Sequence, residues 1–202
     1  MPNVDNALLI GERLYLRGLV EADVSGSYIA WLNDQVVCAG NSHAVFPYGV
    51  NAAITYIKAA QERRDALVLA VVAREGSKHI GNIALQNINA IYRSAELSIL
   101  IGDQACWGQG YGLEAAQLIC RHGFDALNLH RIYCGTYATN IGMQKLANAL
   151  GMSQEGVRRQ AAYKAGNYVD VVEYGMLKGE FVSADTAKPG GKQGRKGKEN
   201  WK

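Results

Sequence analysis

The chain has 202 residues, of which 49% are hydrophobic and 19% are charged, proportions that fit a folded globular protein with one sizeable core. No apolar run is long enough to span a membrane, and the N-terminal segment MPNVDNALLIGERL lacks a basic region followed by an apolar one, so we expect a soluble cytoplasmic protein. The formal net charge of +3 is unevenly distributed, because residues 183–202 hold six of the 21 Lys and Arg but only two of the 18 Asp and Glu.

Residues 183–202, SADTAKPGGKQGRKGKENWK, are rich in Gly and Lys and almost devoid of aliphatic side chains. Such a segment cannot offset its ordering entropy by burial. The sequence therefore predicts a single folded domain over residues 1–182 and a basic disordered tail. A solvated tail is expected, and contact with RNA, a ribosome or membrane phosphates is the alternative.

Cysteine spacing gives no metal motif. Cys38, Cys106, Cys120 and Cys134 form no C-x-x-C pair, and the four histidines are not placed near them at ligand spacing. Buried free thiols in a reducing compartment are expected, and no metal site.

In chain order, residues 10–20 alternate apolar and polar side chains, which predicts a strand. A helix is expected over 21–33, because its apolar side chains share one face. Residues 40–49, GNSHAVFPYG, have the composition of a loop, and 50–64 have helical periodicity.

Three strands are then expected, over 67–73, 79–91 and 95–101. The turn Glu75-Gly76-Ser77 predicts that the first two form an antiparallel hairpin.

The C-terminal half predicts a helix over 110–127, a strand over 131–137, a helix over 140–150, and two last strands over 157–164 and 168–178. The order β-α-α-β-β-β-α-β-α-β-β indicates an α/β fold, with a mixed sheet and one strand–helix–strand crossover at its centre.

The stretch WGQGYGLEA places Gly108, Gly110 and Gly112 directly before a run of helix-forming residues. Each glycine in a helix costs roughly 1 kcal/mol relative to alanine, so their presence needs a reason. A strand followed by a glycine turn and a helix N-terminus forms an anion site, in which backbone N–H groups and the helix dipole favour a phosphate.

The spacing narrows the choice of phosphate ligand. No G-x-x-x-x-G-K-[ST] string is present, and the third glycine comes one residue too early for a dinucleotide fingerprint. A tight turn that binds nothing is the alternative at this point.

The stretch AELSILIGDQACWGQGYG resembles the acetyl-CoA-binding core of the GNAT N-acetyltransferase superfamily. The family pattern there is Q/R-x-x-G-x-G/A, and Trp107 stands where Gln or Arg is usual. ERLYLRGLVEAD, LNLHRIY and G-N-Y-x-D resemble the RimJ/RimL-type branch, and INAIYRSAELSI is also similar to bacterial spermidine acetyltransferases. The resemblance covers roughly residues 10–180 and implies the GNAT fold, a twisted, mostly antiparallel sheet around a β-α-β acetyl-CoA-binding core.

In that family, backbone amides of the turn hold the pyrophosphate of coenzyme A, and the pantetheine arm pairs with the preceding strand like an added strand. The resemblance implies an oxyanion contact from the N–H of Leu100 or Ile101. The implied cofactor-binding residues are Ile99, Leu100, Ile101, Trp107, Gly108, Gln109, Gly110, Tyr111, Gly112, Leu113 and Asn140.

Glu96 is the candidate general base, because it lies on the same strand in an otherwise apolar run and some GNAT enzymes carry a base glutamate in a similar context. A structural glutamate that pairs with Arg93 or caps the strand is the alternative.

Asn140 matches the family residue that contacts the pantetheine, and it is also placed to cap the next helix. Many relatives carry a general-acid tyrosine seven residues later, where this chain has Ala147. Tyr111, Tyr137 and Ser98 are considered as replacement donors, and a thiolate leaving group released to water is the alternative.

Acceptor groups in the family come from the first two helices, their loop and the last hairpin, which points to Trp31, Asn33, His43 and Tyr48. The resemblance implies transfer of an acetyl group from acetyl-CoA to a primary amine by direct attack in a ternary complex. The amine is expected to be a protein N-terminus or a small amino compound. The alternatives are a nucleotide-linked amino sugar or a polyamine, an acyl-CoA-binding module without turnover, and a different acyl donor or acceptor. A homodimer through edge strands is a further implication.

Overall fold

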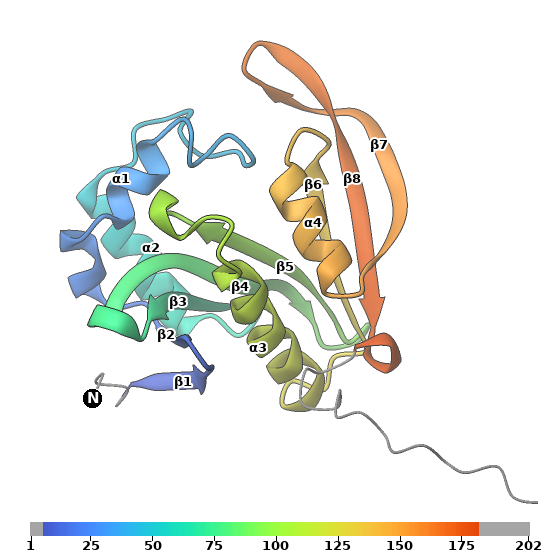
Figure 1. Cartoon of the computed structure of the whole chain (residues 1–202), viewed down its shortest axis with the longest axis horizontal. Helices are drawn as coiled ribbons and strands as arrows, with labels where there is room; N and C mark the ends of the chain where they lie inside the picture. The colour runs from blue at the N-terminus through green and yellow to red at the C-terminus, as the bar shows by residue number, and fades with distance from the viewer. Residues whose placement is uncertain (1–5, 182–202) are drawn as a thin grey trace, which may run out of the picture.

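The computed structural model describes residues 6–181, which form one eight-stranded sheet with helices on both faces (Figure 1). The order across the sheet is β1-β2-β3-β4-β5-β6-β8-β7, and among these described strands only β5 and β6 pair in parallel. The α/β class and the mixed sheet expected from the sequence are confirmed. The strands are β1 (Ala7–Ile10), β2 (Leu14–Gly18), β3 (Leu67–Ala73), β4 (Lys78–Asn89), β5 (Ser94–Ile101), β6 (Arg131–Tyr137), β7 (Ser153–Lys164) and β8 (Asn167–Leu177).

The first predicted strand is in fact two. The expected strand over 10–20 separates into β1 and β2, because the chain turns back at Gly11, whose N–H donates to the carbonyl of Leu14 at 2.9 Å. Apolar alternation continues across this turn, so periodicity alone does not reveal it.

The expected helix over 21–33 is also divided. It consists of a 3₁₀ turn, Glu21–Ser25, and α1 (Tyr28–Asn33), because Gly26 between them has extended backbone angles, φ −91° and ψ −154°. The remaining predicted elements are present with bounds shifted by a few residues, as is usual at element ends.

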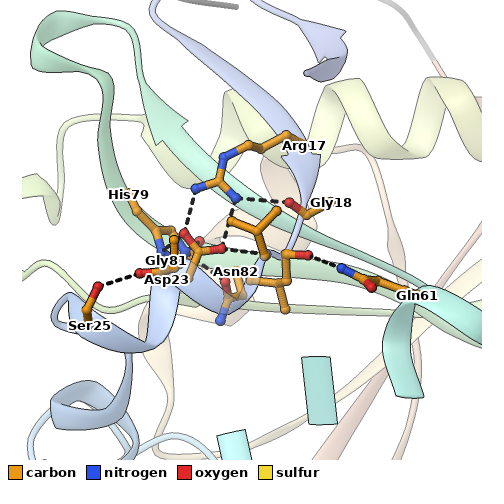
Figure 2. Close-up of polar contacts among 11 residues, drawn as sticks. Arg17, Gly18, Asp23, Ser25, Gln61, His79, Gly81 and Asn82 are labelled. Carbon is orange, nitrogen blue, oxygen red and sulfur yellow. Dashed lines mark hydrogen bonds and ion pairs between the residues drawn. The ribbon is translucent and has the colours of Figure 1, made fainter. Parts of the chain in front are cut away.

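A buried polar cluster holds the 3₁₀ turn against the sheet (Figure 2). The carboxylate of Asp23 accepts two bonds from the guanidinium of Arg17, at 2.6 and 2.9 Å, and one from the N–H of Val20 at 2.9 Å. The Nδ1 atom of His79, on β4, lies 3.4 Å from the same carboxylate. These contacts tie the start of the α1 region to β2 and β4.

Helices cover both faces of the N-terminal half of the sheet (Figure 1). α2 (Val50–Glu62) packs with α1 on one face, and α3 (Tyr111–Asp125) lies on the other. α4 (Ile141–Ala149) packs next to α3 and covers β6, in the C-terminal half of the sheet. Alternate residues of β2 serve the two cores, with Leu14 in the core under α3 and Tyr15 in the core under α1 and α2.

The centre of the sheet opens between β5 and β6. The parallel pairing covers only Ser94–Glu96 on β5 against Arg131–Tyr133 on β6, and α3 connects the two strands. This is the crossover that the sequence predicts. Beyond Glu96 the two strands have no ladder between them.

Among the described residues, Cys38, Cys120 and Cys134 are buried, Cys106 is half-buried, and all four are free thiols. Between residues 6 and 181 there is neither a cluster of metal-binding side chains nor a helix long and apolar enough to cross a membrane. The basic segment 183–202 lies outside the described residues.

Candidate active site

A cleft of about 590 Å³ lies where β5 and β6 diverge. Its walls come from four segments that are distant in sequence: the end of β5, the turn before α3, the start of α4 and the loop 34–49 between α1 and α2. The lining residues include Ile99–Ile101, Trp107, Gly108, Gly110, Gly112, Thr139–Met143, Val36, Val37, Ala39, Gly40 and Asn41.

The glycine turn (residues 107–112) needs its glycines for two different reasons. Gly108 and Gly110 have positive φ angles, 71° and 84°, which side chains disfavour. Gly112 is instead limited by space, because a Cβ there would lie 3.2 Å from Cδ1 of Leu146 on α4. The turn is thus both a special backbone conformation and a close contact between α3 and α4.

The turn leads directly into α3, a helix of 15 residues whose N-cap is Gly110. Its unpaired N–H groups and the positive end of its dipole lie at the cleft that Gly110 and Gly112 line. Backbone groups at such a position bind an anion such as a phosphate.

Two side chains of the turn stabilise its shape. The indole Nε1 of Trp107 donates to the carbonyl of Ile101 at 2.7 Å, and the amide of Gln109 donates to the carbonyl of Ala105. Trp107 remains 43% exposed and lines the cleft, whereas Gln109 does not. Tryptophan therefore fits this position by bonding to the end of β5.

The backbone of β5 is open toward the cleft at alternate residues. The N–H of Gly102 donates to the carbonyl of Ile80 at 2.9 Å, and backbone groups alternate in direction along a strand. Leu100 consequently faces β4, whereas Ile99 and Ile101 direct their N–H and C=O groups toward the diverged β6. Of the two oxyanion donors that the sequence suggests, this geometry favours Ile101.

Most of the expected cofactor residues are brought together at the cleft. Gln109, Tyr111 and Leu113 are the three whose side chains do not line it, and Leu113 packs against the core instead. Those that line it are Ile99, Leu100, Ile101, Trp107, Gly108, Gly110, Gly112 and Asn140.

Asn140 is the N-cap of α4, since its Oδ1 accepts from the N–H of Met143 at 3.1 Å. Its Nδ2 donates to the carbonyl of Gly40 at 3.4 Å. The capping role is therefore observed, and the ligand contact stays a prediction for a residue that does line the cleft.

Glu96 lies at the point where the sheet opens. It is half-buried, it is opposite Tyr133 in the last paired position of β5 and β6, and its Oε2 accepts from Nδ2 of Asn87 at 2.8 Å. The alternative partner, Arg93, bonds instead to Asn128. Because Ala95 and Leu97 face the core under α3, Glu96 faces the opposite side of the sheet.

All four expected acceptor residues lie outside the cleft lining, and Trp31, Asn33 and Tyr48 occupy structural positions. Trp31 is 7% exposed and packs against His79 and Gly102. Asn33 bonds to the backbone of Tyr48 in both directions, at 2.8 Å each, which closes the loop 34–49 at its base.

His43, the fourth, lies on the exposed part of this loop. Partial desolvation by the neighbouring residues and the charge of Lys164 lower the pKa of His43. Lys164 comes from the tip of the β7–β8 hairpin, and its ammonium donates to the carbonyls of Asn41 at 2.8 Å and His43 at 3.3 Å. The hairpin thereby holds the loop beside the cleft.

At the position where many relatives have the general-acid tyrosine, this chain has a residue of the hydrophobic core. Ala147 is fully buried. Tyr111, Tyr137 and Ser98, considered as replacements, are not among the residues that line the cleft. Thr139, just before α4, does belong to the lining.

Two further features were not predicted. Tyr133 faces Glu96, and burial together with the charge of Glu96 raises the pKa of this phenol, which favours its protonated form. The apolar segment 36–41 forms one wall of the cleft. Only the tertiary structure brings this segment to α4, so no sequence periodicity marks it.

Comparison with known proteins gives a consistent result. A family model described as an acetyltransferase (GNAT) domain matches residues 13–153. The chain is 26% identical over 174 residues to the uncharacterized N-acetyltransferase YoaA of Bacillus subtilis, which covers 85% of this chain and 97% of that protein. It is 30% identical over 112 residues to the uncharacterized N-acetyltransferase p20 of Bacillus licheniformis, covering 55% of this chain and 62% of that protein.

Two solved structures share the fold. The spermidine N-acetyltransferase of Vibrio cholerae, in complex with CoA and spermine, aligns with a TM-score of 0.74 at 24% identity, covering 84% of this chain and 98% of that one. RimL, a ribosomal L7/L12 alpha-N-protein acetyltransferase in complex with coenzyme A, aligns with a TM-score of 0.75 at 18% identity, covering 83% and 96%.

Proposed function

The chain belongs to the acetyltransferase (GNAT) domain family, and from this premise we propose that it transfers the acetyl group of acetyl-CoA to a primary amine. One observation carries the proposal: the cleft joins an open strand edge at Ile99–Ile101 to a glycine turn at the N-terminus of α3. An extended amide-containing arm that ends in a pyrophosphate matches both parts.

In this proposal the turn binds the pyrophosphate through backbone N–H groups, and the outward-facing N–H and C=O of Ile99 pair with the pantetheine arm, since the C=O of Ile101 already accepts from Trp107. The cofactor supplies an activated acetyl thioester. The protein holds the thioester in place and offers the N–H of Ile101 as a hydrogen-bond donor to the thioester carbonyl oxygen. The amine then attacks the thioester directly within a ternary complex.

Glu96 is the proposed general base. An amine is protonated at neutral pH and must lose a proton before attack. Glu96 lies at the opening between β5 and β6, on the face of the sheet opposite α3, and an acceptor that enters from that face meets its carboxylate next to Tyr133. No side chain is assigned as the general acid. The thiol of coenzyme A has a pKa near that of cysteine, so its thiolate can leave without being protonated by the protein.

For the acceptor we propose a protein N-terminus or a small amino compound. RimL is named for a ribosomal protein substrate, and the Vibrio cholerae enzyme was solved with spermine. A nucleotide-linked amino sugar or a polyamine is the alternative within the same chemistry. A domain that binds acyl-CoA without turnover is the alternative outside it, since Ala147 replaces the usual tyrosine.

The test is a calorimetric titration with acetyl-CoA. We expect micromolar binding by the native chain and none by Gly110→Asp, because a side chain is strained at the φ of 84° and its Cβ would come 3.2 Å from Nη2 of Arg13, so the turn loses the shape that presents its N–H groups. Gly76→Asp is the matched control, because Gly76 also has a positive φ, 68°, and does not line the cleft. No binding by the native chain would overturn the proposal.

Acceptors are then distinguished by mass spectrometry of the products from a peptide N-terminus, spermidine and an amino sugar. Binding of acetyl-CoA with no acetylated amine would favour the binding module. The domain boundary at residue 182, the basic tail, a homodimer and a cytoplasmic location stay predictions.

A further inference from the structure

Arg13, in the turn between β1 and β2, contacts the glycine turn and α3 at several atoms. Its Nη1 donates to the carbonyl of Gln109 at 2.7 Å, and its Nε donates to Oε2 of Glu114 at 3.0 Å. Its backbone N–H donates to the other oxygen of Glu114 at 2.8 Å, and its guanidinium lies 4.8 Å from the ring centre of Tyr111. One side chain thus bonds on both sides of Gly110.

The bond to Gln109 determines the orientation of the peptide that follows. In a planar trans peptide the C=O and N–H groups point in opposite directions. Because the carbonyl of Gln109 points at Arg13, the N–H of Gly110 points away from Arg13. Gly110 lines the cleft and Arg13 does not, so this orientation directs the N–H toward the cleft side of the turn.

The bond to Glu114 removes an electrostatic conflict. Glu114 lies in the first turn of α3, and its side chain is only 16% exposed. An unpaired carboxylate there would repel a phosphate bound at the same helix end. Arg13 neutralises this carboxylate within the protein and leaves the N–H groups of the turn for the anion.

We propose that Arg13 is a positioning residue for the cofactor, which sets the affinity of the glycine turn for the pyrophosphate without touching the reacting atoms. This inference rests on the proposed function. It predicts an effect on cofactor affinity alone, because the acceptor face and Glu96 are on the opposite side of the sheet from α3.

The experiment compares Arg13→Gln with Arg74→Gln, a matched control whose Nη1 bonds to the carbonyls of Gly11 and Glu12 in the same β1–β2 turn. For Arg13→Gln we expect the Kd and the KM for acetyl-CoA to rise roughly tenfold or more, as for the loss of charge-assisted hydrogen bonds. The kcat at saturating acetyl-CoA and the KM for the amine should stay unchanged. Arg74→Gln should leave all four constants near their native values.

Two further variants separate orientation from charge. Arg13→Lys keeps a positive charge but cannot bond to Gln109 and Glu114 as a fork, so an intermediate Kd is expected. Adding Glu114→Gln to Arg13→Gln removes the repulsive carboxylate and should recover part of the lost affinity.

Equal acetyl-CoA affinity in Arg13→Gln and the native chain would overturn the inference and leave the proposed function intact. A lower Tm and fewer active molecules with an unchanged KM would also overturn it, since that is the result of a purely structural role. Absence of binding by the native chain would overturn the proposed function first and this inference with it.

Discussion

The proposed role of Glu96 as a general base depends on its position in the sheet. On β5 it occupies the last position paired with β6, it receives a hydrogen bond from Asn87, and Tyr133 lies opposite. In the sequence, Glu96 is a carboxylate in an otherwise apolar strand. The fold places this carboxylate at the opening of the sheet, where it can be tested as the base that deprotonates the acceptor amine.

Glu96→Gln should lower kcat by about 10²- to 10³-fold, because a general base contributes that much to proton transfer. The Kd for acetyl-CoA should not change. Stopped-flow rates and calorimetry measure the two effects.

Asn87→Gly is the matched control, since it removes the hydrogen bond to Glu96 but suits the positive φ of 52° at Asn87. It should cost only a few-fold in kcat. A Glu96→Gln variant with native kcat would exclude Glu96 as the base.

Between elements, the loop 34–49 is the part of the cleft wall that depends most on distant contacts. Gly40 lies so close to α4 that a Cβ there would come 2.2 Å from Nδ2 of Asn140. Lys164 holds the neighbouring residues Asn41 and His43 from the β7–β8 hairpin. The loop, α4 and the β7–β8 hairpin therefore meet at one end of the cleft.

Lys164→Met should release the loop, because it removes two hydrogen bonds to loop carbonyls. We expect faster amide hydrogen exchange over residues 36–44 and a rise in the pKa of His43, since the charge of Lys164 contributes to lowering it. Exchange mass spectrometry and NMR titration measure these changes. Lys58→Met, which removes an exposed pair with Glu21, is the control and should change neither.

For the whole molecule, the Asp23 cluster connects stability with pH (Figure 2). Burial by itself would raise the pKa of Asp23, but the hydrogen bonds from Arg17, His79 and the N–H of Val20 together outweigh it, and the pKa lies far below its ordinary value. The native state therefore holds this carboxylate ionised at pH values where the unfolded chain has bound a proton. The stabilisation is complete above the ordinary carboxyl pKa of about 4 and is lost as the pH falls below it.

Asp23→Asn should lower the free energy of unfolding at pH 7 by roughly 3 kcal/mol, because it leaves Arg17 buried without its anionic partner. The difference from the native chain should shrink between pH 4 and pH 2, approximately the range in which the native contribution is lost. Urea unfolding at several pH values measures it. Asp65→Asn, at an exposed pair with Arg63, should have little effect at any pH, and an undiminished Asp23→Asn difference at low pH would contradict this account.

Local patterns were sufficient for most of the elements and for the cofactor side of the site. Strand alternation and helix periodicity act over a few residues, and the glycine turn carries its own signature, because positive φ angles at Gly108 and Gly110 exclude most other residues. Where periodicity continued across a break, as at Gly11 and Gly26, the predicted strand and helix were too long.

By itself the sequence determined the fold class, the central crossover and the glycine turn, since each follows from short-range backbone preferences. Tertiary structure alone decided that Trp31 and Asn33 serve the fold, that the segment 36–41 forms a wall of the cleft, and that Arg13 contacts Glu114 across about a hundred residues of chain. These contacts join segments that are far apart in the chain, so they produce no local pattern or periodicity in the sequence.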